Sequence, residues 1–284
     1  MPLFRSLLVF ALALPLGACG QSDVPRNMSP TQTNEQGCTR KRSIGPQDAY
    51  AVPVPLKQAC VGPYLLELPQ NYYYNQMGPE HDGSFALVLE YPSLEPFKPG
   101  ERINLSVDVS VRSVTIRYSY VDRVTPQEVL RRAYTPWEGR EDDPSASLQG
   151  RIIGETVHGL VPYYVDMDKV RSYFRTQGYR ENAPVMKAGA HFDWYVSRDA
   201  SGAVNQLIEC TPREISESGV EYRDGKMVKK NVHGFAYCNQ TFIIDDLDTV
   251  VRVRYSREGL ADWKRIEARS RALLVENIRK ERNK

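Results

Sequence analysis

Apolar residues at every second position constrain the fold of this chain more than any other feature of its sequence. A period of two places alternate side chains on one face of a β-strand, so such runs predict half-buried strands. Three runs lie close together: Phe85, Leu87, Leu89 and Tyr91; Ile103, Leu105, Val107, Val109 and Val111; and Val114, Ile116, Tyr118 and Tyr120. The apolar phase flips after Ser113, which predicts a bulge or a tight turn between the last two runs.

Paired apolar segments around short polar stretches predict β-hairpins in the second half of the chain. Residues 191–197 and 204–211 form one such pair, and residues 235–244 and 249–255 form another. Between them, Asp224-Gly225 predicts either a third hairpin or a surface loop. Shorter strands are expected at residues 61–69, 152–157 and 161–165.

Three segments carry helical signals. Thr125-Pro126-Gln127-Glu128 combines an N-cap threonine with Pro at N1 and Glu at N3, which predicts a helix over residues 126–134. A second short helix is expected over residues 168–177, ended by Gly178. The last predicted helix has apolar residues at steps of three and four, so one face should pack on a sheet: Leu260, Trp263, Ile266, Leu273, Leu274 and Ile278.

These elements predict an α+β fold with two halves, each a largely antiparallel sheet with a packed helix. Both halves run from strands to a helix, and the polar stretch at residues 178–184 is the best internal boundary. We therefore expect an N-terminal α+β domain at residues 38–182 and a C-terminal α+β domain at residues 183–284.

The first residues are typical of a bacterial lipoprotein signal. Arg5 precedes an apolar run from Leu7 to Leu16, and Leu16-Gly17-Ala18-Cys19 follows. The run is shorter than the roughly 20 residues that span a bilayer. The prediction is a signal peptide at residues 1–18, lipidation of Cys19 and a flexible tether over residues 19–37. The protein is then periplasmic and touches the membrane only through its lipid, and Gly20 in place of Asp favours the outer membrane.

Four cysteines remain after Cys19, an even number that can pair in an oxidising periplasm. Their positions favour local disulfides, Cys38 with Cys60 and Cys210 with Cys238. Metal binding is the weaker alternative, because the chain has no Cys-x-x-Cys and no histidine close to a cysteine.

Charge and motifs argue against several classes of function. The net charge is +2, and basic residues are dispersed among acidic ones, so no nucleic-acid partner is expected. Gly-x-Ser-x-Gly and His-Glu-x-x-His do not occur, and the four histidines are scattered singly. We expect no enzyme, cofactor or metal site, and favour binding of another macromolecule. The alternative of a periplasmic hydrolase requires a deep pocket in which histidine and carboxylate groups converge.

One short motif resembles a known family. The segment from Ala59 to Pro69, with Cys60, Gly62 and Tyr64, is similar to the opening of periplasmic immunity proteins of type VI secretion lipase effectors. The order of signal, tether, two α+β halves and a final helix containing Trp263 is also similar. The resemblance implies a protein that binds a secreted phospholipase toxin and blocks its active site, thereby protecting the producing cell.

Aromatic residues beside acidic ones are the candidate partner contacts, because such anchors are enriched at protein interfaces. The expected contacts are Tyr72, Tyr73, Tyr74, Trp137, Glu138, Asp142 and Asp143. The alternative is that the tyrosines pack in a sheet and the acidic run is a solvated loop. A different function, a cell-envelope scaffold lipoprotein of a secretion or surface assembly, would use the same tether, disulfides and sheets.

Overall fold

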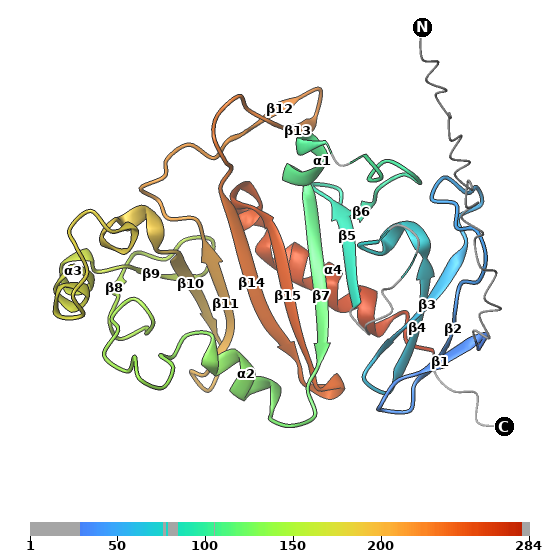
Figure 1. The fold of residues 1–284 in the computed structure, drawn as a ribbon, viewed down its shortest axis with the longest axis horizontal. Helices are drawn as coiled ribbons and strands as arrows, with labels where there is room; N and C mark the ends of the chain where they lie inside the picture. The colour runs from blue at the N-terminus through green and yellow to red at the C-terminus, as the bar shows by residue number, and fades with distance from the viewer. Residues whose placement is uncertain (1–28, 76–77, 79–84, 105, 280–284) are drawn as a thin grey trace, which may run out of the picture.

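The computed structural model describes residues 29–75, 78, 85–104 and 106–279, so the predicted signal and Cys19 lie outside the described residues. Its centre is a nine-stranded antiparallel sheet in the order β6-β5-β7-β15-β14-β11-β10-β9-β8 (Figure 1). In chain order, the strands are β5 (Phe85–Glu90), β6 (Glu95–Pro96), β7 (Ser113–Tyr120), β8 (Ile152–Ile153), β9 (Val161–Tyr164), β10 (Asp193–Arg198), β11 (Val204–Cys210), β14 (Tyr237–Ile244) and β15 (Thr249–Ser256). Helices and antiparallel sheets together confirm the α+β class.

The large sheet is continuous across the boundary expected at residue 182. β7 pairs with β15 from Tyr120↔Thr249 to Thr115↔Arg254, and β9 pairs with β10 at Tyr163↔Trp194. The two predicted halves therefore contribute strands to one sheet and do not each close a sheet of their own. The β10–β11 and β14–β15 hairpins form as predicted, and they supply the middle of this sheet.

Helix α4 (Trp263–Val275) covers one face of the sheet, as its apolar spacing predicts. Ile266, Leu273 and Leu274 are buried in the main core with side chains of the central strands. The hydroxyl of Tyr118 on β7 donates a hydrogen bond to the carbonyl of Ser270, 2.7 Å away. This bond fixes the helix to the sheet at its middle.

Helix α2 (Pro126–Arg132) covers part of the opposite face. It begins as predicted, since the Thr125 hydroxyl accepts a hydrogen bond from the Glu128 amide at 3.2 Å and Pro126 occupies the first turn. Its buried Leu130 packs in a second cluster with Leu207, Ile243 and Val250 of the sheet. α2 is short, so it leaves the middle of this face uncovered (Figure 1).

The expected strand over residues 103–111 is wrong, because residues 107–111 form the helix α1 (Val107–Val111). The Ser106 side chain caps this helix by accepting a hydrogen bond from the Val109 amide at 3.2 Å. Val109 packs with Val88 and Phe97, whereas Val111 enters the main core. The alternating apolar residues here therefore pack in two separate clusters and do not form one face of a strand.

Smaller elements complete the fold. β12 (Val220–Arg223) and β13 (Lys226–Lys229) form the third hairpin, with Asp224 and Gly225 both at positive φ, as a type I′ turn requires. Helix α3 (Met167–Thr176) is capped by Asp166, and Gly178 follows it at φ 80°. The 3-10 turns are η1 (Gln70–Tyr72), η2 (Pro184–Met186), η3 (Ala188–Ala190), η4 (Asp245–Leu247) and η5 (Arg257–Asp262). Within the described residues, every helix is too short or too polar to cross a bilayer.

Both predicted disulfides are present. Cys38–Cys60 links the hairpin of β1 (Thr31–Thr33) and β2 (Thr39–Lys41) to the hairpin of β3 (Leu56–Val61) and β4 (Tyr64–Pro69). Cys210–Cys238 joins directly paired residues of β11 and β14 in the large sheet. One disulfide therefore fastens the N-terminal hairpins to each other, and the other lies inside the core.

Candidate protein-binding surface

The sheet face turned away from α4, called here the open face, is the surface seen from the front in Figure 1. Strand register places two rows of side chains across it. One row consists of Val88, Thr115, Arg254, Asn239, Glu209 and Trp194. The next row consists of Ala86, Arg117, Arg252, Thr241, Leu207 and Val196. The centre of the open face is thus polar, whereas the α4 side of the same strands is apolar.

Three arginines at the centre of this face, Arg117, Arg252 and Arg254, are exposed and are called here the arginine face. Arg117 and Arg252 lie directly opposite each other on β7 and β15, a position that brings Cβ atoms within roughly 5 Å. None of the three forms an ion pair with a carboxylate of the described residues. Like charges in this position destabilise a sheet, so the arrangement has a local cost.

At one side of the arginine face, an aromatic ring and a carboxylate lie next to the arginines. The guanidinium carbon of Arg254 lies 3.9 Å from the ring centroid of Tyr237. Glu209 is the only carboxylate in the two rows. Burial raises the pKa of Glu209, and the charges of Arg151 and Arg252 oppose that shift. One half-buried carboxylate therefore balances only part of the positive charge.

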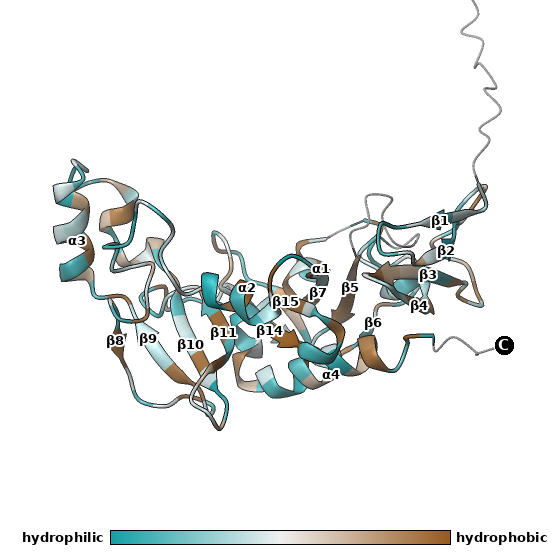
Figure 2. Cartoon of the chain, turned by 90° about the horizontal axis from the view of Figure 1, so that it is seen from below, coloured by the Kyte–Doolittle hydropathy of each residue, from teal (hydrophilic) through white to brown (hydrophobic). Residues whose placement is uncertain are grey.

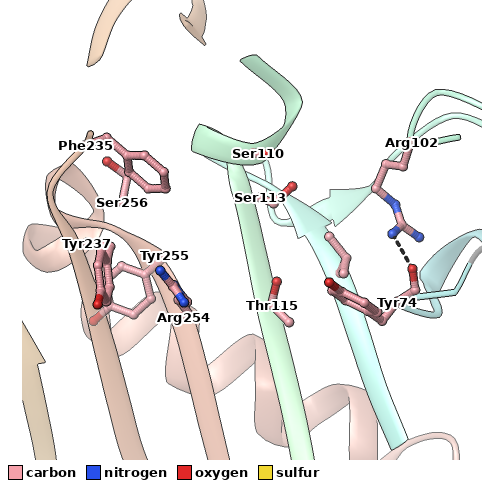
Figure 3. Close-up of a pocket in the computed structure, with 11 residues that line it drawn as sticks. Tyr74, Arg102, Ser110, Ser113, Thr115, Phe235, Tyr237, Arg254, Tyr255 and Ser256 are labelled. Carbon is pink, nitrogen blue, oxygen red and sulfur yellow. Dashed lines mark hydrogen bonds between the residues drawn. The ribbon is translucent and has the colours of Figure 1, made fainter. Parts of the chain in front are cut away.

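Three hollows lined by described residues adjoin the open face. The first, of about 310 Å³, is lined by Thr115, Tyr237 and Arg254 together with Tyr74 at its far wall (Figure 3). The second, of about 640 Å³, lies between Arg117 and residues 32–36 of the N-terminal hairpin. The third, of about 810 Å³, lies beside α2. In Figure 2, the lobe that contains α3 rises on one side of the sheet, and the β1–β4 hairpins rise on the other. The open face is therefore a hollowed surface between raised flanks.

The described lining of these hollows does not resemble a hydrolytic site. None of the three is lined by a histidine, so no histidine meets a carboxylate there, as the hydrolase alternative requires. His191 is occupied elsewhere, with its Nε2 2.8 Å from the carbonyl oxygen of Val185. Across the residues that the structure describes, no cluster of three potential metal ligands occurs.

Four of the sequence-predicted contact residues lie at the surface. Tyr74 is 57% exposed and lines the first hollow, while Trp137 is 69% exposed and lines the third together with Glu138. Asp142 is exposed in the loop that follows. The structure thus places aromatic candidates at both sides of the open face and acidic candidates at one side.

The other three candidates are engaged inside the protein. Tyr73 is fully buried, and its hydroxyl donates a hydrogen bond to the carbonyl of Lys57 at 2.7 Å. Asp143 is also buried, where it pairs with Arg140 and accepts a hydrogen bond from the Ser145 amide at 2.9 Å. Tyr72 is half-buried against the main core. Burial withdraws Tyr73 and Asp143 from the candidate contacts.

The arginine face itself was not among the predicted contacts. Its only signal in the sequence is that arginines occupy the polar positions of predicted strands, as in Val251-Arg252-Val253-Arg254. Charged residues at such positions are ordinary for a solvent-facing strand. Only the pairing of β7 with β15 shows that Arg117 joins them.

Comparison with known proteins gives one informative similarity. The chain is similar to the solved structure of an immunity protein of the Stenotrophomonas maltophilia type IV secretion system. The two are 27% identical, with a TM-score of 0.69, and the similarity covers 89% of this chain and 100% of the other. No protein-family model matches the sequence, and no curated protein matches it. The similarity therefore extends over a whole immunity protein and is not confined to one motif.

Proposed function

We propose that this protein is a periplasmic immunity protein that binds and neutralises a toxin delivered by a bacterial secretion system. The observation that carries the proposal is the similarity to an immunity protein along that protein's entire length. A hollowed polar surface between raised flanks is consistent with binding of a protein partner. The two disulfides are consistent with an oxidising compartment such as the periplasm.

A phospholipase is the proposed target, on the strength of the motif from Ala59 to Pro69. In the structure this segment contains most of the β3–β4 hairpin, and the carbonyl of Gly62 accepts a hydrogen bond from the Asn34 side chain at 2.7 Å. Gly62 has a positive φ, and a Cβ there would collide with the ring of Tyr120. These contacts give the motif a structural role, so it supports the fold more directly than the chemistry of the toxin.

The route of toxin delivery has two candidates. The motif resembles immunity proteins of type VI effectors, whereas the similar solved structure comes from a type IV system. Because an immunity protein recognises the toxin and not the secretion apparatus, either route is compatible with the same binding surface. Attacker strains that lack one apparatus or the other distinguish the two.

We also propose that the protein is lipidated on Cys19 and held at the outer membrane. The tether predicted over residues 19–37 is too long, because Thr31–Thr33 form β1 and pair with β2. The proposed tether therefore ends before β1 and would join the anchor to the folded part at its N-terminal hairpin. Such an anchor would keep the inhibitor in the compartment where an incoming toxin acts.

The test is a survival assay between sister strains. A strain that lacks this gene serves as prey for its otherwise identical parent, and we expect its survival to fall and to recover when the full chain is supplied again. Attackers without the type IV or type VI apparatus should lose this killing if that apparatus delivers the toxin. Survival of the deletion strain at the parental level would contradict immunity. Loss of a secretion or surface structure in unattacked cells would favour the scaffold alternative.

A further inference from the structure

We propose that the arginine face binds an acidic segment of the toxin, which enters the hollow between the raised flanks of the open face. This inference deepens the proposed immunity function and rests on it. The occupant is a protruding stretch of polypeptide that carries several Asp or Glu side chains. The two rows of the open face, and not the β3–β4 motif, then provide recognition of the toxin.

The first argument is the uncompensated charge. Other arginines of the described residues have partners for their guanidinium groups: Arg112 pairs with Glu90 and Glu101, each at 2.8 Å, and buried Arg102 and Arg151 donate hydrogen bonds to backbone carbonyls. Among the residues that the structure describes, no carboxylate forms an ion pair with Arg117, Arg252 or Arg254, although two of these arginines face each other directly across neighbouring strands. A partner that brings carboxylates would remove the repulsion and add charge-assisted hydrogen bonds.

The second argument is the chemistry of the floor around the arginines. Thr115 and Asn239, both half-buried, occupy neighbouring positions beside Arg254 and can hydrogen-bond to a bound backbone. Guanidinium groups bind carboxylates in a bidentate way, which fixes the orientation of the bound group as well as its charge. Tyr237, beneath Arg254, adds an aromatic contact at the edge of the first hollow.

The third argument is shape. Arg254 lines the first hollow and Arg117 the second, so the positive charge lies at the walls of depressions in the surface. Figure 2 shows the flanking lobes rising above the sheet on both sides. A flat bilayer would meet these lobes before it reached the arginines, whereas a projecting protein segment fits between them.

The experiment uses charge reversal with a matched control. Arg252→Glu changes the charge in the centre of the arginine face, and Lys264→Glu makes the same change on exposed Lys264 of α4, behind the sheet. Each full-length variant is returned to the deletion strain and challenged by the parent. We expect Arg252→Glu and the triple variant R117E/R252E/R254E to lose protection, while Lys264→Glu protects as the wild type does.

The same variants are then measured against the toxin, taken as the effector whose deletion from the attacker restores survival of the unprotected prey. We expect each reversal on the arginine face to weaken binding by about 10- to 100-fold. The triple lysine variant keeps the charge but loses the bidentate geometry, so its affinity should lie between those of the wild type and the triple glutamate variant. Wild-type affinity should fall as salt rises, and the affinity of the triple glutamate variant should fall less.

A triple glutamine variant keeps the test valid if three glutamates disturb folding. Removing like charges that face each other should leave R117Q/R252Q/R254Q at least as stable as the wild type in urea, yet weaker in binding. A variant that loses stability and binding in parallel would count against a recognition role.

The outcomes separate the two proposals. If the deletion strain survives attack, the immunity function itself fails. If the deletion strain dies but the triple glutamate and glutamine variants protect it fully, immunity stands and the arginine face is not the toxin site. Flotation with phosphatidylglycerol vesicles tests whether the arginine face binds a lipid surface instead. If the triple glutamate variant loses vesicle binding while its toxin affinity is unchanged, the proposal is overturned in favour of a lipid surface.

Discussion

The guanidinium of Arg151 stacks on the ring of Trp194, with its central carbon 3.6 Å from the ring centroid. Arg151 belongs to the segment that follows α2, and Trp194 lies on β10 in the open face. The same guanidinium donates hydrogen bonds to the carbonyls of Phe192 and Ser145, each at 2.7 Å. Burial lowers the pKa of Arg151 to about 10, so it remains charged at neutral pH. One side chain thus fastens the loop beside the third hollow to the sheet.

Replacement of this arginine should be costly. Arg151→Ala removes the stacking partner of Trp194 and leaves buried carbonyls without their donor, so we expect the free energy of unfolding to fall by about 2–4 kcal/mol. Urea unfolding followed by tryptophan fluorescence measures the change.

Arg213→Ala is the matched control for the stacking contact. Arg213 lies over the ring of Tyr164 at the same 3.6 Å, but its side chain is 54% exposed. Its removal should cost no more than about 1 kcal/mol. Equal losses for the two variants would show that the buried hydrogen bonds of Arg151 contribute little.

The two disulfides should stabilise different parts of the protein. Replacing Cys38 and Cys60 by Ala releases the β1–β2 hairpin from β3, so hydrogen exchange should rise in residues 31–41 while the large sheet stays protected. Replacing Cys210 and Cys238 should lower the stability of the whole domain, because both lie in paired central strands. Each bridge is worth about 3 kcal/mol in the chain-entropy description. Uniform loss of protection in both variants would contradict this division.

Asp193 should make stability depend on pH. Burial raises the pKa of this carboxyl to about 6, although one of its oxygens accepts a hydrogen bond from the Arg213 amide at 2.8 Å. The folded state therefore favours the protonated form, and this contribution is present below about pH 4 and is lost as the pH rises to about 6.

Comparison with Asp193→Asn isolates this effect, since other titrating groups are common to both proteins. In urea unfolding, the variant should gain stability relative to the wild type between about pH 4 and pH 6 and show a constant difference above that range. A difference that does not change with pH would show that this carboxyl keeps its ordinary pKa.

Trp137 should contribute to binding and not to folding. Because its side chain is 69% exposed beside the third hollow, Trp137→Ala should leave the free energy of unfolding within about 0.5 kcal/mol. We expect toxin affinity to fall by about tenfold or more, as for an aromatic anchor at an interface. Tyr222→Ala, at an exposed tyrosine on β12, is the control and should bind normally. Unchanged binding by Trp137→Ala would remove this residue from the contact surface.

Cys19→Ser tests the anchor. The variant should no longer be lipidated, so fractionation should recover it from the soluble periplasm and no longer from the membrane. Disulfide content should stay the same, because Cys19 is not a member of either pair. Retention of the variant in the membrane fraction would contradict the lipoprotein prediction.

Local signals in the sequence predicted local structure well. The cap at Thr125, the two central hairpins, the C-terminal helix and both disulfides all depend on residues close in the chain, and all are present. The wrong prediction of a strand at residues 107–111 also arose from a local signal. Alternating valines fit a strand, and only the contacts of Val109 and Val111 with different clusters favour a helix there.

Long-range pairing could not be predicted in the same way. The sequence contains no local mark that β7 pairs with β15, so neither the single sheet nor the meeting of Arg117 with Arg252 was expected. Tyr73 and Asp143 show the converse problem. Their residue types fit an interface, yet a hydrogen bond to Lys57 and an ion pair with Arg140 occupy them inside the fold.

The pairing of β7 with β15 also governs when the protein can fold. The strand that contains Tyr120 gains its β15 neighbour only when Thr249 and the residues after it are present, and α4 follows later in the chain. Contacts between residues so far apart slow folding, since a long loop has to close before they form. As the chain is synthesised, β7 remains without this partner until residues 249–256 have appeared. A shortened chain that ends before β15 would therefore lack the strand that joins β7 to β14, and its sheet would be divided into two parts.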